Sequence, residues 1–176
     1  VVGGAEVLSH AQEDPLGRYR LASNIVTDAQ LLIDALEYAK TVANRHPGAA
    51  VDALGPHLAA IETVAFRNRY LGQGLMEWAS AYRVIDSVEL PVIEAALLYG
   101  RLSCESGRQG YHQALWGIDQ GLRACPYNEA LVRVAMEIEA LLGNAEAVNH
   151  RYLTLATRLA RDELEPEPET SELRVR

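Results

Sequence analysis

The sequence predicts an all-α fold of stacked helical hairpins, with one short strand before the helices. Hydrophobic residues make up 49% of the 176 residues and aromatic residues only 6%, a composition typical of helices that pack closely through small side chains. Through the second half of the chain, apolar residues recur every three or four positions, the period of an amphipathic helix. Glycine and proline then divide this periodic part into segments of ordinary helix length. A chain of this size can bury one core and a second small lobe.

The strand and the first helix are expected near the start of the chain. Residues 17–21, GRYRL, alternate like an exposed strand. Thr27 and Asp28 form a good N-cap, and Leu32 and Leu36 follow on one helical face, so the first helix is expected at about 28–44. The sequence HPG at 46–48 then ends this helix.

The pattern between residues 49 and 90 is less regular. We expect a short helix over 49–54 that ends at Gly55-Pro56, and a further helix over 58–70. The sequence LGQG at 71–74 breaks the pattern again before Trp78.

Two helical hairpins are clear in the second half, over 91–125 and 128–162. Pro91 suits a first helical turn, and Gly107 separates the two helices of the first hairpin. Asn128 is a good N-cap for the second hairpin, and Gly143 divides it. These two glycines lie 36 residues apart, close to the repeat length of tetratricopeptide solenoids, whose stacked hairpins bury each other's apolar faces and leave a concave groove. Small residues would let the helices approach closely at four positions: Ala114, Gly117, Gly121 and Ala147.

The acidic tail DELEPEPETSEL, residues 162–173, has two interpretations. A charge run of this kind is most often a solvated, flexible end. Alternatively, the tail turns into a short last helix that begins at Pro168 and packs back through Leu173.

Charge and composition exclude several classes of function. The net charge of −8 argues against direct binding to a nucleic acid backbone, because that affinity comes largely from Lys and Arg. Arg151, Arg158 and Arg161 could form a basic stripe on the last long helix, where a solvated face is favoured over a phosphate track. Cys104 and Cys125 are expected to be buried free thiols in a reducing cytoplasm. We find no apolar run long enough to cross a bilayer and no signal peptide, so we expect a soluble cytoplasmic chain without membrane contact.

No sequence motif indicates an active site. The five histidines form no HExxH or HxxxH pattern, and no GxGxxG, GxxxxGK[ST] or GxSxG is present. We therefore expect no catalytic residue, no metal and no cofactor. Four aromatic residues could anchor a partner, although core packing is the default interpretation: Trp78, Tyr99, Trp116 and Tyr152.

Two segments resemble the bacterial transcriptional activator domain. These are GLRACPYNEALVRVAMEIEALLGNAEAV, residues 121–148, and LARDELEPEPETSEL, residues 159–173. The matching positions are a proline turn, an inner-face methionine, a helix-ending glycine and the acidic-proline tail: Pro126, Met136, Gly143, Glu163-Leu164 and Pro168-Glu169-Thr170. A weaker similarity extends back to Trp78. Glu165 stands where the family usually has glycine, and 49–74 matches no part of it. These departures bring the chain closer to actinobacterial relatives in which the same module occurs in large proteins with LysM or membrane segments.

The resemblance implies a non-enzymatic interaction module of a transcriptional regulator. Such a module would couple a DNA-binding unit to RNA polymerase, to a regulatory domain or to a second copy of itself as a homodimer. Residues 1–27, with the strand at 17–21, would be the remnant of a winged-helix unit, and 28–176 would be the helical-repeat domain. DNA would be contacted only through the unit that is largely missing. The alternative is a scaffold role in an envelope-associated protein, and an enzyme is a distant third. On the repeat alignment, Tyr99, Arg133 and Glu137 are the candidate groove residues.

Overall fold

The fold of residues 26–61 and 84–174 is all-helical in a computed structural model, which describes these two ranges. No strand occurs within them, so the predicted all-α class is confirmed for this part of the chain. The predicted strand at 17–21, the LGQG break and Trp78 lie outside the described residues. The elements are α1 (Asp28–Val42), α2 (Pro47–Ala59), α5 (Val84–Cys104), α6 (Arg108–Ala124), α7 (Glu129–Leu141), α8 (Ala145–Leu159), the 3-10 turn η2 (Ala160–Asp162) and α9 (Pro168–Leu173).

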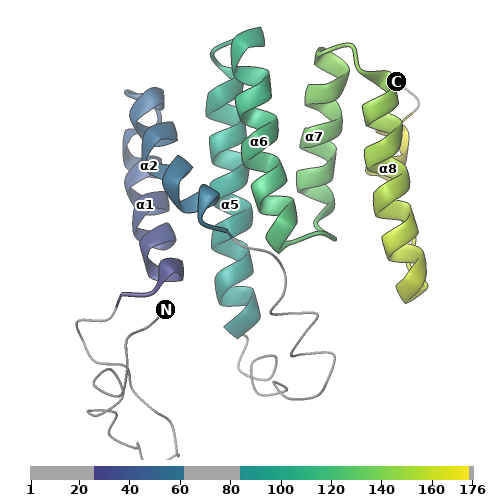
Figure 1. Cartoon of the computed structure of the whole chain (residues 1–176), viewed down its shortest axis with the longest axis horizontal. Coiled ribbons are helices and arrows are strands. Elements are labelled where there is room, and N and C mark those ends of the chain that lie inside the picture. Colours follow the sequence, from purple (N-terminus) through teal and green to yellow (C-terminus); the bar gives the residue numbers. More distant parts are fainter. Residues whose placement is uncertain (1–25, 62–83, 175–176) are drawn as a thin grey trace, which may run out of the picture.

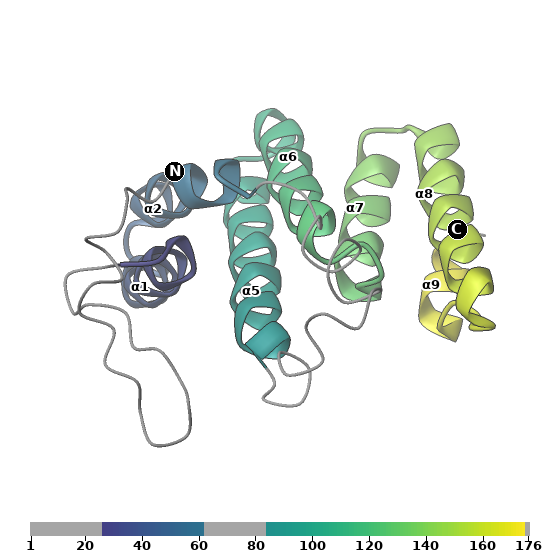
Figure 2. The ribbon, with the colours of Figure 1, turned by 60° about the horizontal axis from the view of Figure 1, so that its bottom comes forward.

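The long helices pack in pairs that form a row (Figure 1). Helix α1 packs on α2, α5 on α6 and α7 on α8. Contacts of α2 with α5, and of α6 with α7, join the pairs into one body. The short α9 returns to pack on α7, and Figure 2 shows it beside the lower part of the α7–α8 pair.

The helix ends that carry local capping signals lie where the sequence places them. Helix α1 begins after Thr27, whose Oγ1 accepts a hydrogen bond from the Gln30 N–H at 3.1 Å. Helix α7 begins after Asn128, whose Oδ1 accepts from the Leu131 N–H at 3.0 Å. Gly143 takes a φ of +79° between α7 and α8, a conformation that favours glycine at a helix C-terminus. These three predictions are therefore confirmed.

The predicted break at Gly55-Pro56 is wrong, because α2 continues through it from Pro47 to Ala59. Pro56 lacks the N–H for one helical bond, and its ring is exposed. Leu54 and Leu58 on either side are fully buried, and such burial contributes roughly 1.5–3 kcal/mol for each side chain. We infer that this burial offsets the missing bond. The described part of the helix predicted over 58–70 is thus the C-terminal end of α2.

The predicted helix start at Pro91 is also wrong, because Pro91 lies inside the 21-residue α5, which is already helical at Val84. Proline cannot donate a bond to the carbonyl four residues earlier, which disfavours it inside a helix by about 3 kcal/mol. The residues that follow are buried against the neighbouring helices, namely Val92, Ala95 and Ala96. Packing again outweighs a local signal.

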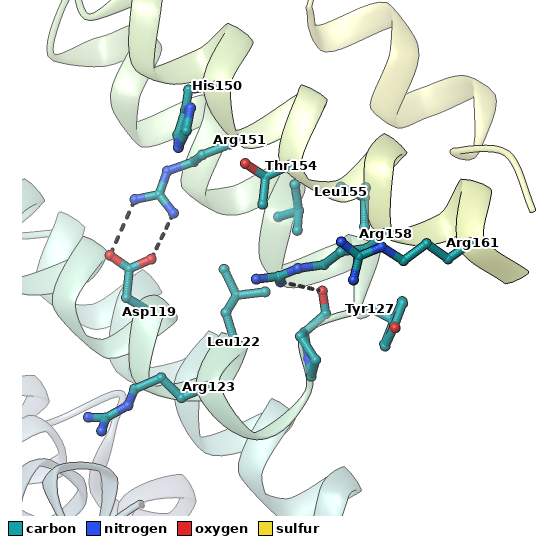
Figure 3. A pocket seen from close by; sticks show the side chains of 12 residues that line it. Asp119, Leu122, Arg123, Tyr127, His150, Arg151, Thr154, Leu155, Arg158 and Arg161 are labelled. Carbon is teal, nitrogen blue, oxygen red and sulfur yellow. Dashed lines mark hydrogen bonds and ion pairs between the residues drawn. The ribbon is translucent and has the colours of Figure 1, made fainter. Parts of the chain in front are cut away.

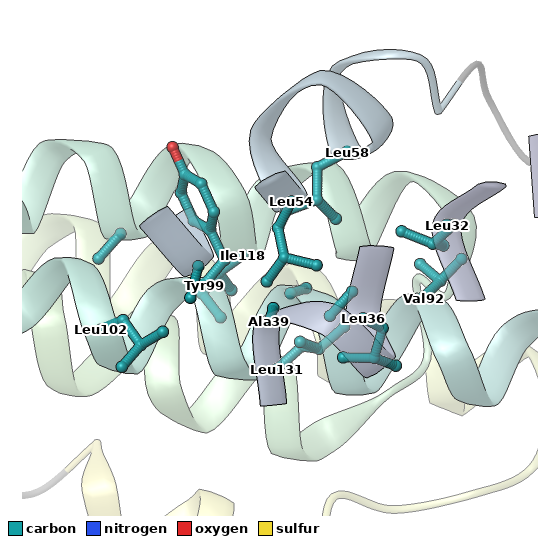
Figure 4. Close-up of a cluster of buried hydrophobic side chains, with 14 of the residues drawn as sticks. Leu32, Leu36, Ala39, Leu54, Leu58, Val92, Tyr99, Leu102, Ile118 and Leu131 are labelled. Carbon is teal, nitrogen blue, oxygen red and sulfur yellow. The ribbon is translucent and has the colours of Figure 1, made fainter. Parts of the chain in front are cut away.

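The main core runs through five helices, from α1 to α7 (Figure 4). Its largest buried side chains include Leu54, Leu58, Ile118 and Leu131. Gly117 makes one close approach between α5 and α6, where a Cβ atom would lie only 2.3 Å from Cδ1 of Tyr99. A second, smaller cluster packs α7 on α8 and contains Val132, Met136, Val148, Leu155 and Leu159. The predicted role of small residues in close helix contact is therefore confirmed at Gly117.

Candidate functional site

A groove of about 560 Å³ lies between α6, the turn that follows it and α8 (Figure 3). Leu122, Val132 and Leu155 give it an apolar floor, and Tyr127 lies at its side in the turn. The remaining lining residues are mostly cationic or polar: Asp119, Arg123, Pro126, His150, Arg151, Thr154, Arg158 and Arg161. We call this surface the basic groove.

Arg151 closes one end of the basic groove by joining three helices. Its Nη1 lies 2.7 Å from Oδ1 of Asp119 on α6, and its Nη2 lies 3.2 Å from Oε1 of Glu139 on α7. Burial disfavours the charge of Arg151, but the hydrogen bonds and charges of the two carboxylates outweigh this effect and raise its pKa. The Arg151 side chain is only 19% exposed. The interpretation of Arg151 as part of a solvated stripe is therefore wrong.

The other arginines of the basic groove have weaker ties. Nη1 of Arg123 donates to Oε1 of Gln120 at 3.0 Å, and Nη1 of Arg158 donates to the carbonyl of Pro126 at 3.3 Å. Arg161 is exposed and forms no ion pair with another described residue. Figure 3 shows the guanidinium groups of Arg158 and Arg161 on the same side of the groove, near the turn that follows α6. These two arginines are available to an anion.

A second hollow of about 480 Å³ adjoins the basic groove along α8. It shares His150, Thr154, Arg158 and Arg161 with the groove. Positions 150, 154 and 158 recur every four residues on one face of α8, and Arg161 follows them in the 3-10 turn η2. The two hollows therefore share one side of α8 and η2, on which Arg158 and Arg161 are the arginines.

Arg133, one of the predicted groove residues, holds the acidic tail against α7. It forms an ion pair with Glu167 and donates from Nη1 to Oγ1 of Thr170 at 3.1 Å. Glu129 Oε2 accepts from Oγ1 of Thr170 at 2.6 Å and from the Glu167 N–H at 3.0 Å. Thr170 is fully buried, and Leu173 packs on the α7–α8 cluster. Of the two interpretations of the tail, the docked short helix is confirmed.

The structure gives the other two predicted groove residues different surroundings. Tyr99 is only 4% exposed and packs between α5 and α6, where its hydroxyl accepts from Nε2 of Gln113 at 3.1 Å. Burial raises the pKa of Tyr99. Its ring centroid lies 5.5 Å from that of Trp116. Glu137 is exposed on α7. Of Tyr99 and Glu137, only Glu137 is therefore exposed enough to contact a partner.

Sequence reasoning missed the contribution of α6 and the following turn to the basic groove. The spacing of Arg151, Arg158 and Arg161 marks the α8 side of the site. Arg123 and Tyr127 reach the groove because α6 and α8 both pack on α7, which no local pattern encodes. Of the two cysteines, Cys125 is buried as expected, whereas Cys104 is only partly buried.

Two further observations concern the described ranges 26–61 and 84–174. In them, no group of three or more His, Cys, Asp or Glu side chains is placed to hold a metal ion. None of their helices is both long and apolar enough to span a bilayer. Comparisons with models of known protein families, with curated proteins and with solved structures found no match.

Proposed function

We propose that this chain is a non-catalytic, tetratricopeptide-like interaction module of a bacterial transcriptional regulator. In this proposal it couples a DNA-binding unit to RNA polymerase, to a regulatory domain or to a second copy of the chain. The cytoplasm is then its compartment. Residues 17–21 would be the last strand of a wing, and DNA would be contacted through that winged-helix unit. The resemblance to the bacterial transcriptional activator domain supports each of these points.

The docked acidic tail is the observation that supports this proposal most. The positions that carry the resemblance are structural residues of one motif: Glu163 takes a left-handed φ of 59°, and Pro168 begins α9. Thr170, the last residue of that match, is the fully buried partner of Glu129 and Arg133. The tail positions that carry the resemblance thus include a buried residue that holds the tail on α7.

The mechanism is binding by a preformed surface. The main core joins α1 to α7, a smaller cluster packs α8 on α7, and the ion pairs of Arg151 connect α6, α7 and α8. Guanidinium groups keep their charge at neutral pH, so the basic groove is suited to hold an anion rather than to transfer protons. A rigid surface also loses little conformational entropy on binding, which favours affinity from a few contacts.

The alternative proposal is a scaffold in a large envelope-associated protein with a LysM segment. Glu165 favours it, because the bacterial activator domain usually has glycine at that position. A helical interaction module would serve either role. The sequence upstream of the chain discriminates the two proposals, since a basic recognition helix indicates the regulator and membrane spans indicate the scaffold.

Binding of the purified chain to immobilised RNA polymerase of the source organism tests the leading proposal. Biolayer interferometry at several salt concentrations should give saturable binding that weakens as salt screens the contact. Glu137→Lys changes the exposed groove candidate, and Glu105→Lys is the matched control on the turn after α5. Arg133→Glu is unsuitable as a probe, because it would release the tail.

The outcomes separate the two proposals. Saturable binding that Glu137→Lys weakens, and that Glu105→Lys leaves unchanged, would support a polymerase contact on the α7 surface. Equal weakening by both variants would overturn that choice of surface. No binding at roughly tens of micromolar, with the chain folded by circular dichroism, would overturn the polymerase contact and favour the scaffold.

A further inference from the structure

We propose that the basic groove binds an acidic peptide segment that also carries apolar side chains, presented by a partner protein. This inference rests on the proposed function and names the chemistry of the partner. It follows from the charge of the groove, the apolar floor beneath that charge and the way the arginines are held.

The charge of the groove is opposite to that of the whole chain. Four arginines and one aspartate line it, a net charge of +3 with histidine neutral, whereas the chain carries −8. An acidic protein repels most other acidic proteins at long range, so a local cationic surface selects where an acidic segment can dock. The groove is therefore complementary to carboxylates.

Arg158 and Arg161 are the main carboxylate ligands in this proposal. They lie three residues apart, Arg158 in the last turn of α8 and Arg161 in η2, and both line the two hollows. Two nearby guanidinium groups repel each other, and a carboxylate between them relieves that repulsion. Arg158 is already held by the carbonyl of Pro126, so less side-chain entropy is lost when it binds.

The floor of the groove favours a peptide over a nucleic acid. Leu122, Val132 and Leu155 line the groove beside the arginines, and the partly exposed Leu122 offers an apolar side chain a contact that a phosphate would not use. Tyr127 adds an aromatic wall that is 37% exposed. A nucleic acid would also require a longer cationic track, since its affinity grows with the number of phosphates neutralised. The acidic peptide uses both the charge and the floor.

Fluorescence anisotropy with a labelled peptide of alternating Glu and Leu tests the proposal. The comparison peptide replaces each Glu with Gln, and a duplex DNA serves as the competing anion. The main variant is Arg158→Glu with Arg161→Glu. Arg161→Glu alone is a second variant that loses no hydrogen bond to another described residue. Arg101→Glu with Arg108→Glu is the matched control at exposed positions outside the groove.

The Glu peptide should bind saturably, and the Gln peptide should bind at least about tenfold more weakly. The main variant should lose about tenfold or more in affinity, and the matched control less than about twofold. Equal loss in the groove variants and the control would overturn the proposal, as would absence of peptide binding. Duplex DNA that displaces the peptide at lower concentration would overturn it in favour of a phosphate track.

The polymerase assay keeps the two proposals distinguishable. If the peptide binds as expected but the chain does not bind polymerase, the proposed function fails and the groove assignment stands. If polymerase binds but the peptide does not, the groove assignment alone fails.

Discussion

Replacement of Gly117 by alanine should destabilise the chain, although alanine is the better helix former. The new Cβ would lie 2.3 Å from Cδ1 and 2.8 Å from Cε1 of Tyr99, whereas carbon atoms in contact prefer about 3.5–4.0 Å. The Tyr99 ring is 4% exposed and its hydroxyl is held by Gln113, so it has little room to withdraw. Overpacking costs about 1–3 kcal/mol and the helix gain is at most about 1 kcal/mol. We expect a net loss of about 1–2 kcal/mol in the free energy of unfolding.

Gly48→Ala is the matched control for this prediction. Gly48 lies in the first turn of α2, and no atom lies within 4 Å of the position that its Cβ would occupy. This change should leave stability unchanged or raise it by about 0.5 kcal/mol. Urea unfolding followed by circular dichroism measures both variants, with similar slopes expected. A Gly117→Ala protein as stable as the Gly48→Ala protein would refute the close packing of α5 on α6.

Three further predictions concern the tail, the ion pairs and the core tyrosine. Thr170→Val removes the hydroxyl that donates to Glu129 and should weaken docking of the tail by about 2 kcal/mol. Amide hydrogen exchange in α9 should then be faster than in the original chain, whereas the exposed Thr157→Val control should leave it unchanged. Unchanged exchange in Thr170→Val would refute this role of Thr170. Arg151→Leu should lower the free energy of unfolding by about 2–3 kcal/mol, less than for a fully buried pair, and an unchanged urea midpoint would contradict this. The pKa of Tyr99 is raised in the folded state, so the protonated tyrosine contributes to the free energy of unfolding. This contribution is complete below the unfolded pKa of about 10 and is lost as the pH rises through the folded pKa. Absorbance at alkaline pH should show one tyrosine that ionises late and that Tyr99→Phe removes.

Local signals in the sequence predict most of the described helix ends. A side chain that caps a helix acts on the backbone only a few residues away, which is why Thr27 and Asn128 place the starts of α1 and α7 correctly. Pro56 and Pro91 fail as boundary signals for the opposite reason. The burial that holds those helices together comes from partners distant in sequence, so local propensity underestimates it.

The site was less predictable than the fold. The period of α8 places its arginines on one face, but it cannot tell which of them meets a carboxylate. Arg151 does so because Asp119 and Glu139 lie on two other helices, and Arg161, ten residues later, has no such partner among the described residues. Likewise, Tyr99 enters the core because Gly117 on another helix leaves room for its ring. Each outcome depends on a pair of residues from different helices.

Some arginines of the last helix pair have carboxylate partners among the described residues and others do not, and this difference indicates from which side a partner approaches the pair. Arg133 and the docked tail cover part of α7, where the polar groups of Thr170, Glu167 and Glu129 already satisfy one another. A partner there would first have to displace α9. The basic groove requires no such displacement, because Arg161 is exposed and Arg158 is held by a single carbonyl among the described residues. Binding energy is therefore gained with less rearrangement on the α6–α8 side, and release of the tail by Thr170→Val should leave affinity for the acidic peptide within about twofold.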